Sequence, residues 1–158
     1  MSSDSLKVPK TLKEVSLWVH PEGRVVGSLF LRERGAGNKE LEQPLDVLNR
    51  ASPFLVLQRE QPDELRFYNR ASIIRVEYRD ETPTATEGTS TLPCELMLMD
   101  GSVLDGSVRE ELPPDHARLF DYLNQSDNQF LRIFFDDGGA CLVNKSYIIY
   151  VRTTQSTA

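Results

Sequence analysis

Hydrophobic and polar residues alternate over short stretches along most of the chain, as they do in antiparallel β-strands with one buried face. Val15, Leu17 and Val19 begin this pattern. They alternate with Glu14, Ser16 and Trp18. Residues 20–23 are His-Pro-Glu-Gly, which predicts a turn because proline fixes φ and glycine accepts a left-handed backbone. Residues 25–31 are then expected to return as the second strand of a β-hairpin.

The rest of the chain predicts further short elements, in an order that occurs twice. The first series continues with a loop at 32–43, a short helix at 45–49 behind Pro44, and strands at 54–58, 65–68 and 73–78. The second series comprises strands at 95–99 and 102–109, a helix that opens at 113–115, and strands at 130–135, 140–143 and 148–152. Proline suits a first helical turn because its missing N–H would have no partner there.

Each series ends on nearly the same segment. Residues 68–76 are Tyr-Asn-Arg-Ala-Ser-Ile-Ile-Arg-Val, and residues 143–151 are Val-Asn-Lys-Ser-Tyr-Ile-Ile-Tyr-Val. Three more pairs of segments align in the same order: Gly27-Ser28 with Gly106-Ser107, 45–49 with 120–124, and Phe54-Leu55 with Phe130-Leu131. The offsets between the two series stay between 75 and 79 residues. The sequence therefore predicts a tandem duplication of one small unit.

The predicted fold class is mainly β, with one short helix in each of two units of order β-β-α-β-β-β. Five short strands and a helix are too few for a sandwich, but they can curl into a small SH3- or Sm-like barrel. The expected division is a disordered segment 1–13, a first barrel 14–79, a Thr/Pro-rich linker 80–93, a second barrel 94–152 and a tail 153–158.

The last strand of each unit has one face that is expected in the core. Ile74 and Val76 share this face in the first unit, and Ile149 and Val151 share it in the second. By the same alternation, Tyr150 is expected to face outward.

Composition and charge narrow the class of protein. The 158 residues are 39% hydrophobic and 27% charged, which is typical of a soluble globular protein. The net charge is −6, and a protein that binds nucleic acid by releasing counterions needs a basic surface instead. Residues 14–79 hold ten basic and ten acidic residues, whereas residues 94–152 hold five and ten. With no apolar signal region or membrane-spanning stretch, we expect a cytoplasmic protein without membrane insertion.

No residue pattern predicts a catalytic or metal site. His20 and His116 are the only histidines, and neither has a cysteine or carboxylate nearby in ligand spacing. Cys94 and Cys141 are far apart and are expected to be reduced, buried thiols. We therefore expect no enzymatic activity, no metal and no cofactor.

Matched polar positions in the two units are the first candidates for binding. Asn69 precedes Arg70, and Asn144 precedes Lys145 at the same place in the second unit. The asparagines are suited to bend the chain into the last strand. The alternative is a repeated ligand site made by each asparagine and the base that follows it.

Three aromatic residues are the other binding candidates. Trp18, Tyr147 and Tyr150 combine a large apolar area with a polar tip, which suits a protein interface. Trp18 is equally suited to pack between the two units.

The second unit resembles a family of small bacterial domains. The resemblance rests on residues 118–124, Arg-Leu-Phe-Asp-Tyr-Leu-Asn, then Phe130-Leu131, then the V-N-K-x-x-I-x-x-V pattern at 143–151. It implies the fold unit and a bacterial origin, with no activity attached. The first unit departs from the pattern at Pro44, where the family helix carries leucine, and at Arg70 in place of lysine.

A weaker likeness links the chain to Sm-like RNA-binding proteins. Residues 100–108 are similar to the first Sm signature, and residues 145–151 are similar to the second. The Sm-like resemblance implies a nucleic-acid site near the asparagine and the base that follows it.

We expect a non-enzymatic protein-binding or scaffold module made of two divergent units. The second unit is acidic and carries Tyr147 and Tyr150, so it is expected to hold the main protein-binding surface, with Tyr150 as an anchor. The alternative is an Sm-like nucleic-acid-binding protein. A homo-oligomer is compatible with the first interpretation.

Overall fold

The structure is a computed structural model that describes residues 10–32, 42–80, 90–110, 116–125 and 128–153. The strands of the first half are β1 (Lys10–Val19), β2 (Gly23–Arg32), β3 (Phe54–Glu60), β4 (Asp63–Asn69) and β5 (Ile73–Arg79). Those of the second half are β6 (Ser90–Leu98), β7 (Val103–Glu110), β8 (Phe130–Phe134), β9 (Gly139–Asn144) and β10 (Ile148–Thr153). The helices are α1 (Pro44–Leu48) and α2 (His116–Leu123), and single 3₁₀ turns are η2 (Arg70–Ser72) and η3 (Lys145–Tyr147).

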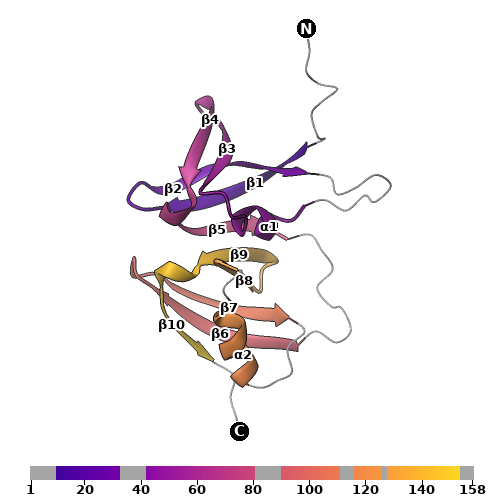
Figure 1. Ribbon diagram of the computed structural model, residues 1–158, viewed down its shortest axis with the longest axis vertical. Coiled ribbons are helices and arrows are strands. Elements are labelled where there is room, and N and C mark those ends of the chain that lie inside the picture. Colours follow the sequence, from indigo (N-terminus) through magenta and orange to yellow (C-terminus); the bar gives the residue numbers. More distant parts are fainter. Residues whose placement is uncertain (1–9, 33–41, 81–89, 111–115, 126–127, 154–158) are drawn as a thin grey trace, which may run out of the picture.

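The described strands form one ten-stranded sheet in the order β10-β6-β7-β8-β9-β5-β1-β2-β3-β4. Every neighbouring pair is antiparallel. The second half of the chain forms one end of the sheet and the first half forms the other (Figure 1). Within each half the order of the strands is the same, because the fifth strand returns beside the first. The sheet is open, and β4 and β10 are its outer strands.

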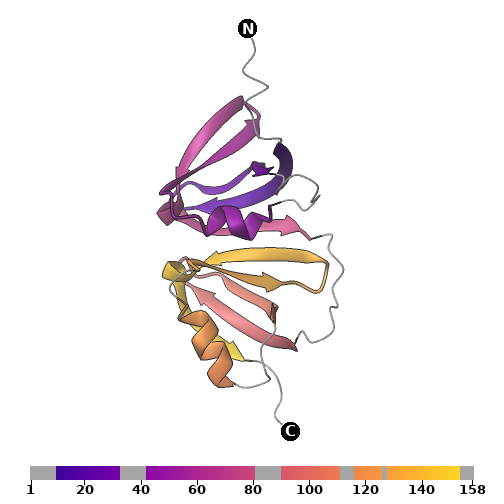
Figure 2. The same cartoon turned by 45° about the vertical axis from the view of Figure 1, so that its right-hand side comes forward.

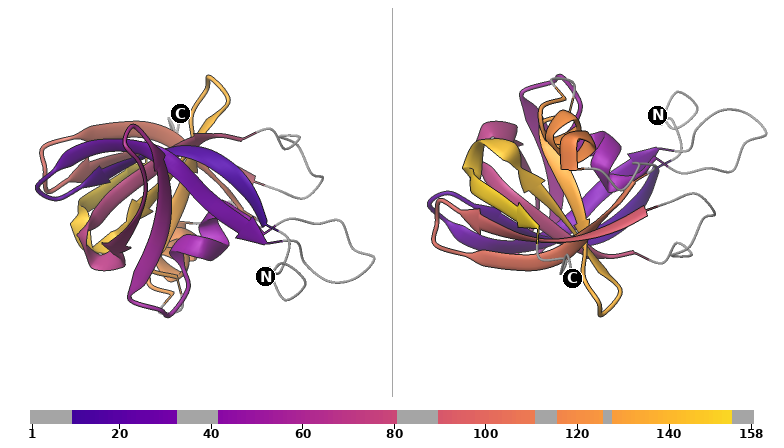
Figure 3. Two further views of the ribbon diagram at one scale, coloured as in Figure 1. Left: turned by 90° about the horizontal axis from the view of Figure 1, so that it is seen from above. Right: turned by 90° about the horizontal axis from the view of Figure 1, so that it is seen from below.

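Each half has a core cluster, built mostly from its own residues. The first cluster is built around leucines that alternate with exposed or half-buried residues, including Leu17, Leu29 and Leu57. The second cluster contains Leu96 and Ile133 at corresponding strands. Seen along the long axis, the β1–β2 hairpin overlies the β6–β7 hairpin (Figure 3). The two halves therefore repeat one arrangement of strands along this axis.

A glycine in each half allows the second strand to run close against the third. A Cβ on Gly27 would lie 2.8 Å from the main-chain oxygen of Gln58, and one on Gly106 would lie 2.8 Å from that of Phe134. Real Cβ atoms do not approach so closely, so any other residue would push the strands apart. The matched glycines of the sequence are thus explained by matched close contacts.

The fifth strand of each half is bulged at the same place. The pairing of β5 with β1 passes from Arg75 to Ile73 and skips Ile74. The pairing of β10 with β6 passes from Tyr150 to Ile148 and skips Ile149. A bulged residue breaks the regular alternation of a strand. Ile74 and Ile149 are therefore released from the faces that alternation would give them.

The core position predicted for Ile149 is wrong, because the bulge turns this residue away from the core of its own half and, in the described chain, no other half lies beyond β10 to cover it. Its side chain is 58% exposed, whereas Ile74 is 5% exposed and Val76 is fully buried. Val151 is half-buried against the second cluster. Alternation correctly assigned Val76 and Val151 after the bulge, but the bulge by itself does not decide whether Ile74 or Ile149 is buried.

The prediction of a mainly β fold with few helices is confirmed. The two small barrels predicted with it are not confirmed, because the described strands form one open sheet. Two strand starts are also earlier than predicted. β1 begins at Lys10, inside the segment expected to be disordered, and β6 begins at Ser90, inside the expected linker. These polar residues pair with the far ends of β2 and β7, because main-chain hydrogen bonds do not require hydrophobic side chains. Residues 1–9, 81–89 and 154–158, where disorder, a linker and a tail were predicted, lie outside the described residues.

Candidate functional site

The two halves meet where β5 pairs with β9, and apolar side chains cross this junction in both directions. Val76 of β5 lies opposite Leu142 of β9. Ile74 of the first half packs in the core cluster of the second half. Phe130, Ala140 and Leu142 of the second half pack in the core cluster of the first. Each half therefore completes the core of the other.

Two asparagines make hydrogen bonds across the junction. Asn144 Nδ2 donates to the oxygen of Ile73 over 2.9 Å, and the N–H of Phe130 donates to Asn49 Oδ1 over 2.8 Å. Asn144 Oδ1 also accepts from Ser146 N at 2.9 Å, which closes the η3 turn. Asn144 is 1% exposed, so these bonds satisfy a buried amide.

The outer strands expose apolar side chains at both ends of the sheet. Leu65 and Phe67 of β4, with Phe54 on the adjacent strand β3, form what we call the β4 surface. Ile149 and Tyr150 form the β10 surface. The two surfaces lie on strands at opposite ends of the long axis (Figure 1). An outer strand with a free edge and apolar side chains is a ready template for pairing with another chain.

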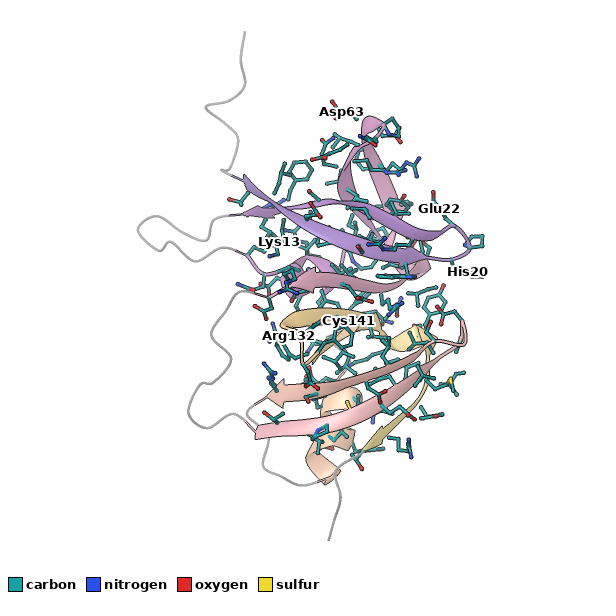
Figure 4. All side chains as sticks on the ribbon, turned by 180° about the vertical axis from the view of Figure 1, so that it is seen from behind. Lys13, His20, Glu22, Asp63, Arg132 and Cys141 are labelled. Atoms are coloured by element: carbon teal, nitrogen blue, oxygen red, sulfur yellow. The ribbon has the colours of Figure 1, made fainter. Side chains whose placement is uncertain are left out.

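Charged residues beside the β4 surface are paired with one another. Arg66 donates hydrogen bonds to Glu64 at 2.9 Å, to Glu22 at 3.0 Å and to the Tyr68 hydroxyl at 3.1 Å. The bonds to Tyr68 and Glu64 are the main causes that raise the pKa of Arg66. Figure 4 shows Glu22 at the β1–β2 turn and Asp63 at the tip of the β3–β4 hairpin. The positive charge of Arg66 is thus balanced by the neighbouring carboxylates of Glu22 and Glu64.

The β10 surface has a similar polar border. The Tyr150 hydroxyl donates to Glu95 Oε2 at 3.2 Å, and Arg152 Nε donates to the same oxygen at 3.2 Å. The Arg152 hydrogen bond lowers the pKa of Glu95. Tyr150 is exposed, as predicted, and its hydroxyl is held by a carboxylate on the neighbouring strand β6.

Arg70 and Lys145 tie the two 3₁₀ turns to main-chain carbonyls. Arg70 Nη2 donates to the oxygen of Val47 at 3.0 Å, and Lys145 Nζ donates to that of Gln125 at 3.2 Å. Burial lowers the pKa of both side chains. Arg70 is 7% exposed, and its Nε and Nη1 have no hydrogen-bond partner within the described residues. The two bases are matched in position, each is bonded to a main-chain carbonyl, and they do not form an open basic surface.

Of the three aromatic residues predicted as binding candidates, two pack against the second cluster and one is exposed on an outer strand. Trp18 is half-buried beside the junction, against the second cluster, with the Arg75 guanidinium 3.9 Å from its ring centroid. Tyr147 is half-buried against the same cluster. Tyr150 lies on the β10 surface. Of the residues predicted from the sequence, only Tyr150 therefore belongs to an outer apolar surface.

The described residues hold no group that could bind a metal through three or more His, Cys, Asp or Glu side chains. Cys94 and Cys141 are free and buried, and burial raises the pKa of Cys94 to about 11. Burial also raises the pKa of Cys141, which lies on β9 (Figure 4). A buried thiol with a raised pKa is a poor nucleophile at neutral pH.

Sequence reasoning missed Phe54, Leu65, Phe67 and Ile149 as surface residues. One signal was present in β4, where Leu65 and Phe67 alternate with Tyr68 so that both faces carry apolar residues. Such a strand either lies between two cores or meets a partner. The order of strands, which puts β4 at an end of the sheet, was needed to decide between the two.

Comparison of the chain with protein-family models, with curated proteins and with solved structures finds no match. No helix in the described part of the chain is long and apolar enough to cross a membrane.

Proposed function

We propose that this protein is a non-enzymatic protein-binding or scaffold module built from two divergent copies of one small SH3- or Sm-like unit. The observation that supports this best is the pair of outer strands, each with exposed apolar side chains and with one edge that no other described strand pairs with. Phe67 is 69% exposed and Ile149 is 58% exposed, and both lie on edge strands rather than at loop tips. Proteins bind such edges by adding a strand, with main-chain hydrogen bonds for affinity and side chains for selectivity.

The polar residues near these surfaces favour a protein partner over a nucleic acid. A nucleic-acid site needs accessible cations to replace the counterions of the phosphates. Arg66 and Arg152 are instead ion-paired with Glu64, Glu22 and Glu95. Of the base positions that the Sm-like likeness implied, Arg70 is buried and Lys145 is bonded to a carbonyl.

The proposal can be tested by placing a photo-crosslinking amino acid at single positions. Benzoylphenylalanine would replace Phe67 or Tyr150 in cells that produce the protein, and the cross-linked products would be identified by mass spectrometry. We expect protein adducts at both positions. Val26 is the matched control, because it is 43% exposed against 41% for Tyr150 but lies on the inner strand β2.

Two results would contradict the proposal. Adducts to RNA or DNA at Phe67 and Tyr150 would favour the nucleic-acid function. Equal yields of protein adducts at Val26 and at the outer strands would show that the outer strands have no special role.

A further inference from the structure

The exposed residues of the outer strands are the counterparts of the residues buried at the junction. Asn69 aligns with Asn144, so an offset of 75 places Ile149 on Ile74, Phe67 on Leu142 and Leu65 on Ala140. Phe54 aligns with Phe130, and each of the two phenylalanines lies opposite the matched asparagine of its half. The residues that are buried at the junction therefore have counterparts on the outer strands, and these counterparts are exposed.

The exposures of these pairs differ in the same direction each time. Ile74 is 5% exposed and Ile149 is 58% exposed. Phe130, Ala140 and Leu142 are at most 1% exposed, whereas Phe54, Leu65 and Phe67 are 53%, 51% and 69% exposed. On β9, Val143 packs in the core cluster of its own half and Leu142 packs in that of the other half. On β4, their counterparts differ in the same way: Tyr68 packs in the core cluster of its own half, and Phe67 does not. Leu65 lies on the same face as Phe67 and is also outside that cluster.

We infer that the partner of the outer strands is a second copy of this chain, bound head to tail so that β10 of one copy pairs with β4 of the next. This inference rests on the proposed function and names its partner. Ile149 enters the first-half core of the next copy, as Ile74 enters the second-half core within one chain. Phe54, Leu65 and Phe67 of the next copy extend the second-half core of the first.

The junction also fixes the register of this contact. Arg75 lies opposite Val143 and Val76 opposite Leu142. The offset of 75 converts these pairs to Tyr150 opposite Tyr68 and Val151 opposite Phe67 of the next copy. Asn69, whose side chain is exposed, then corresponds to Asn144, which donates across the junction to Ile73. Asn124, also exposed, corresponds to Asn49, which accepts from Phe130.

The helices support the same arrangement. α1 lies beside the junction in Figure 2, and α2 has the corresponding place beside β10, next to the surface that the second copy would cover. The side chain of Phe120 on α2 is 67% exposed, whereas its counterpart Leu45 is partly buried against the first cluster.

Charges at the new contact differ from those at the junction. Arg152 would lie opposite Arg66, a pairing of like charges that is unfavourable by itself. Each arginine keeps its own carboxylates, because Glu95 lies beside Arg152 and Glu64 and Glu22 lie beside Arg66. We therefore expect the intermolecular contact to be weaker than the junction within a chain.

The contact joins two different surfaces, so it is heterologous. Every copy that uses its β10 surface still offers a β4 surface, and association continues until it closes into a ring or extends as a filament. Two edge variants distinguish this arrangement from a symmetric dimer. Ile149→Glu removes the β10 surface, and Phe67→Glu removes the β4 surface.

The experiment is sedimentation velocity on purified full-length protein over a concentration series. We expect the unmodified protein to grow in mass with concentration to species beyond a dimer, and each edge variant alone to remain a monomer. An equimolar mixture of the two variants should form a heterodimer and nothing larger, because one variant supplies an intact β4 surface and the other an intact β10 surface. Circular dichroism and the thermal midpoint of the dilute variants establish that each is folded.

Leu12→Glu is the matched control, since Leu12 is 54% exposed but lies on the inner strand β1, and this variant should assemble like the unmodified protein. The inference is overturned if the unmodified protein stays monomeric, if either edge variant still dimerises, or if the mixture fails to form a heterodimer. Should the protein stay monomeric while the photo-crosslinks at Phe67 and Tyr150 reach another protein, the inference fails and the proposed function stands. If neither result is positive, both fail.

Discussion

At the scale of single residues, two asparagines with the same local role have different surroundings. Asn69 Oδ1 accepts from the N–H of Ala71 at 2.9 Å, and Asn144 Oδ1 accepts from the N–H of Ser146 at the same distance. Only Asn144 is buried, because β9 lies between β8 and β5 while β4 is an outer strand. Its Nδ2 donates to the oxygen of Ile73, which the exposed Asn69 does not reproduce within the described chain.

This difference predicts unequal effects of one substitution. Asn144→Ala leaves buried polar groups without partners and should destabilise the protein by about 1–3 kcal/mol. Asn69→Ala removes a cap that water can replace and should cost about 0.5–1 kcal/mol. Urea unfolding at low protein concentration measures both changes. Equal losses would show that the junction bond of Asn144 contributes nothing beyond the local turn.

At the scale of elements, the second strand of each half depends on its glycine. β2 and β3 share the pair Ser28–Gln58, and β7 and β8 share the pair Ser107–Phe134, one residue after Gly27 and Gly106. In each half, the second and third strands share only this one regular residue pair, and they are also held by the close approach of their main chains at the glycine. A side chain at the glycine would separate them.

Gly27→Ala is therefore expected to destabilise the protein by about 1–3 kcal/mol, because the added methyl group overlaps Leu57 and the Gln58 oxygen. Ser28→Ala, one residue further, adds no atom at this contact and should change the free energy of unfolding by less than about 0.5 kcal/mol. Thermal and urea unfolding provide the measurement. A neutral Gly27→Ala variant would mean that β2 and β3 can move apart without loss.

At the scale of the whole molecule, the exchange of side chains at the junction couples the two halves. Ile74 lies in the second-half cluster, and Phe130 and Leu142 lie in the first-half cluster. Neither core is complete without the other half. Trp18 is beside the junction, which makes its fluorescence a direct probe of this region.

We predict that Ile74→Ala lowers the stability of the whole chain by about 2–5 kcal/mol, because it removes a buried side chain and leaves a cavity. In dilute, monomeric protein, Ile149→Ala should cost less than about 0.5 kcal/mol, since the side chain is 58% exposed. Unfolding followed by Trp18 fluorescence and by circular dichroism should coincide in a single transition. Two separate transitions would show that the halves fold independently.

The sequence by itself determined which elements form and that their order occurs twice. Alternation of polar and apolar residues predicted the strands, and the aligned segments around Gly27, Phe54, Asn69 and Ile74 predicted the correspondence between the halves. These signals are local: strand periodicity, turn chemistry and glycine placement act within a few residues. The local pattern did not predict the polar first residues of β1 and β6, because these residues are held in their strands by pairing with other strands and not by hydrophobic side chains of their own.

Only the tertiary structure decided which copy of each matched residue is buried. Ile74 and Ile149 occupy the same bulge in nearly the same sequence, yet one lies in a core and the other is exposed. The same holds for Leu142 and Phe67. Burial of these residues depends on whether another half lies beyond the strand edge, and that is set by the pairing of β5 with β9 and by where the sheet ends. A local pattern carries no information about a neighbour that arrives from the other half of the chain.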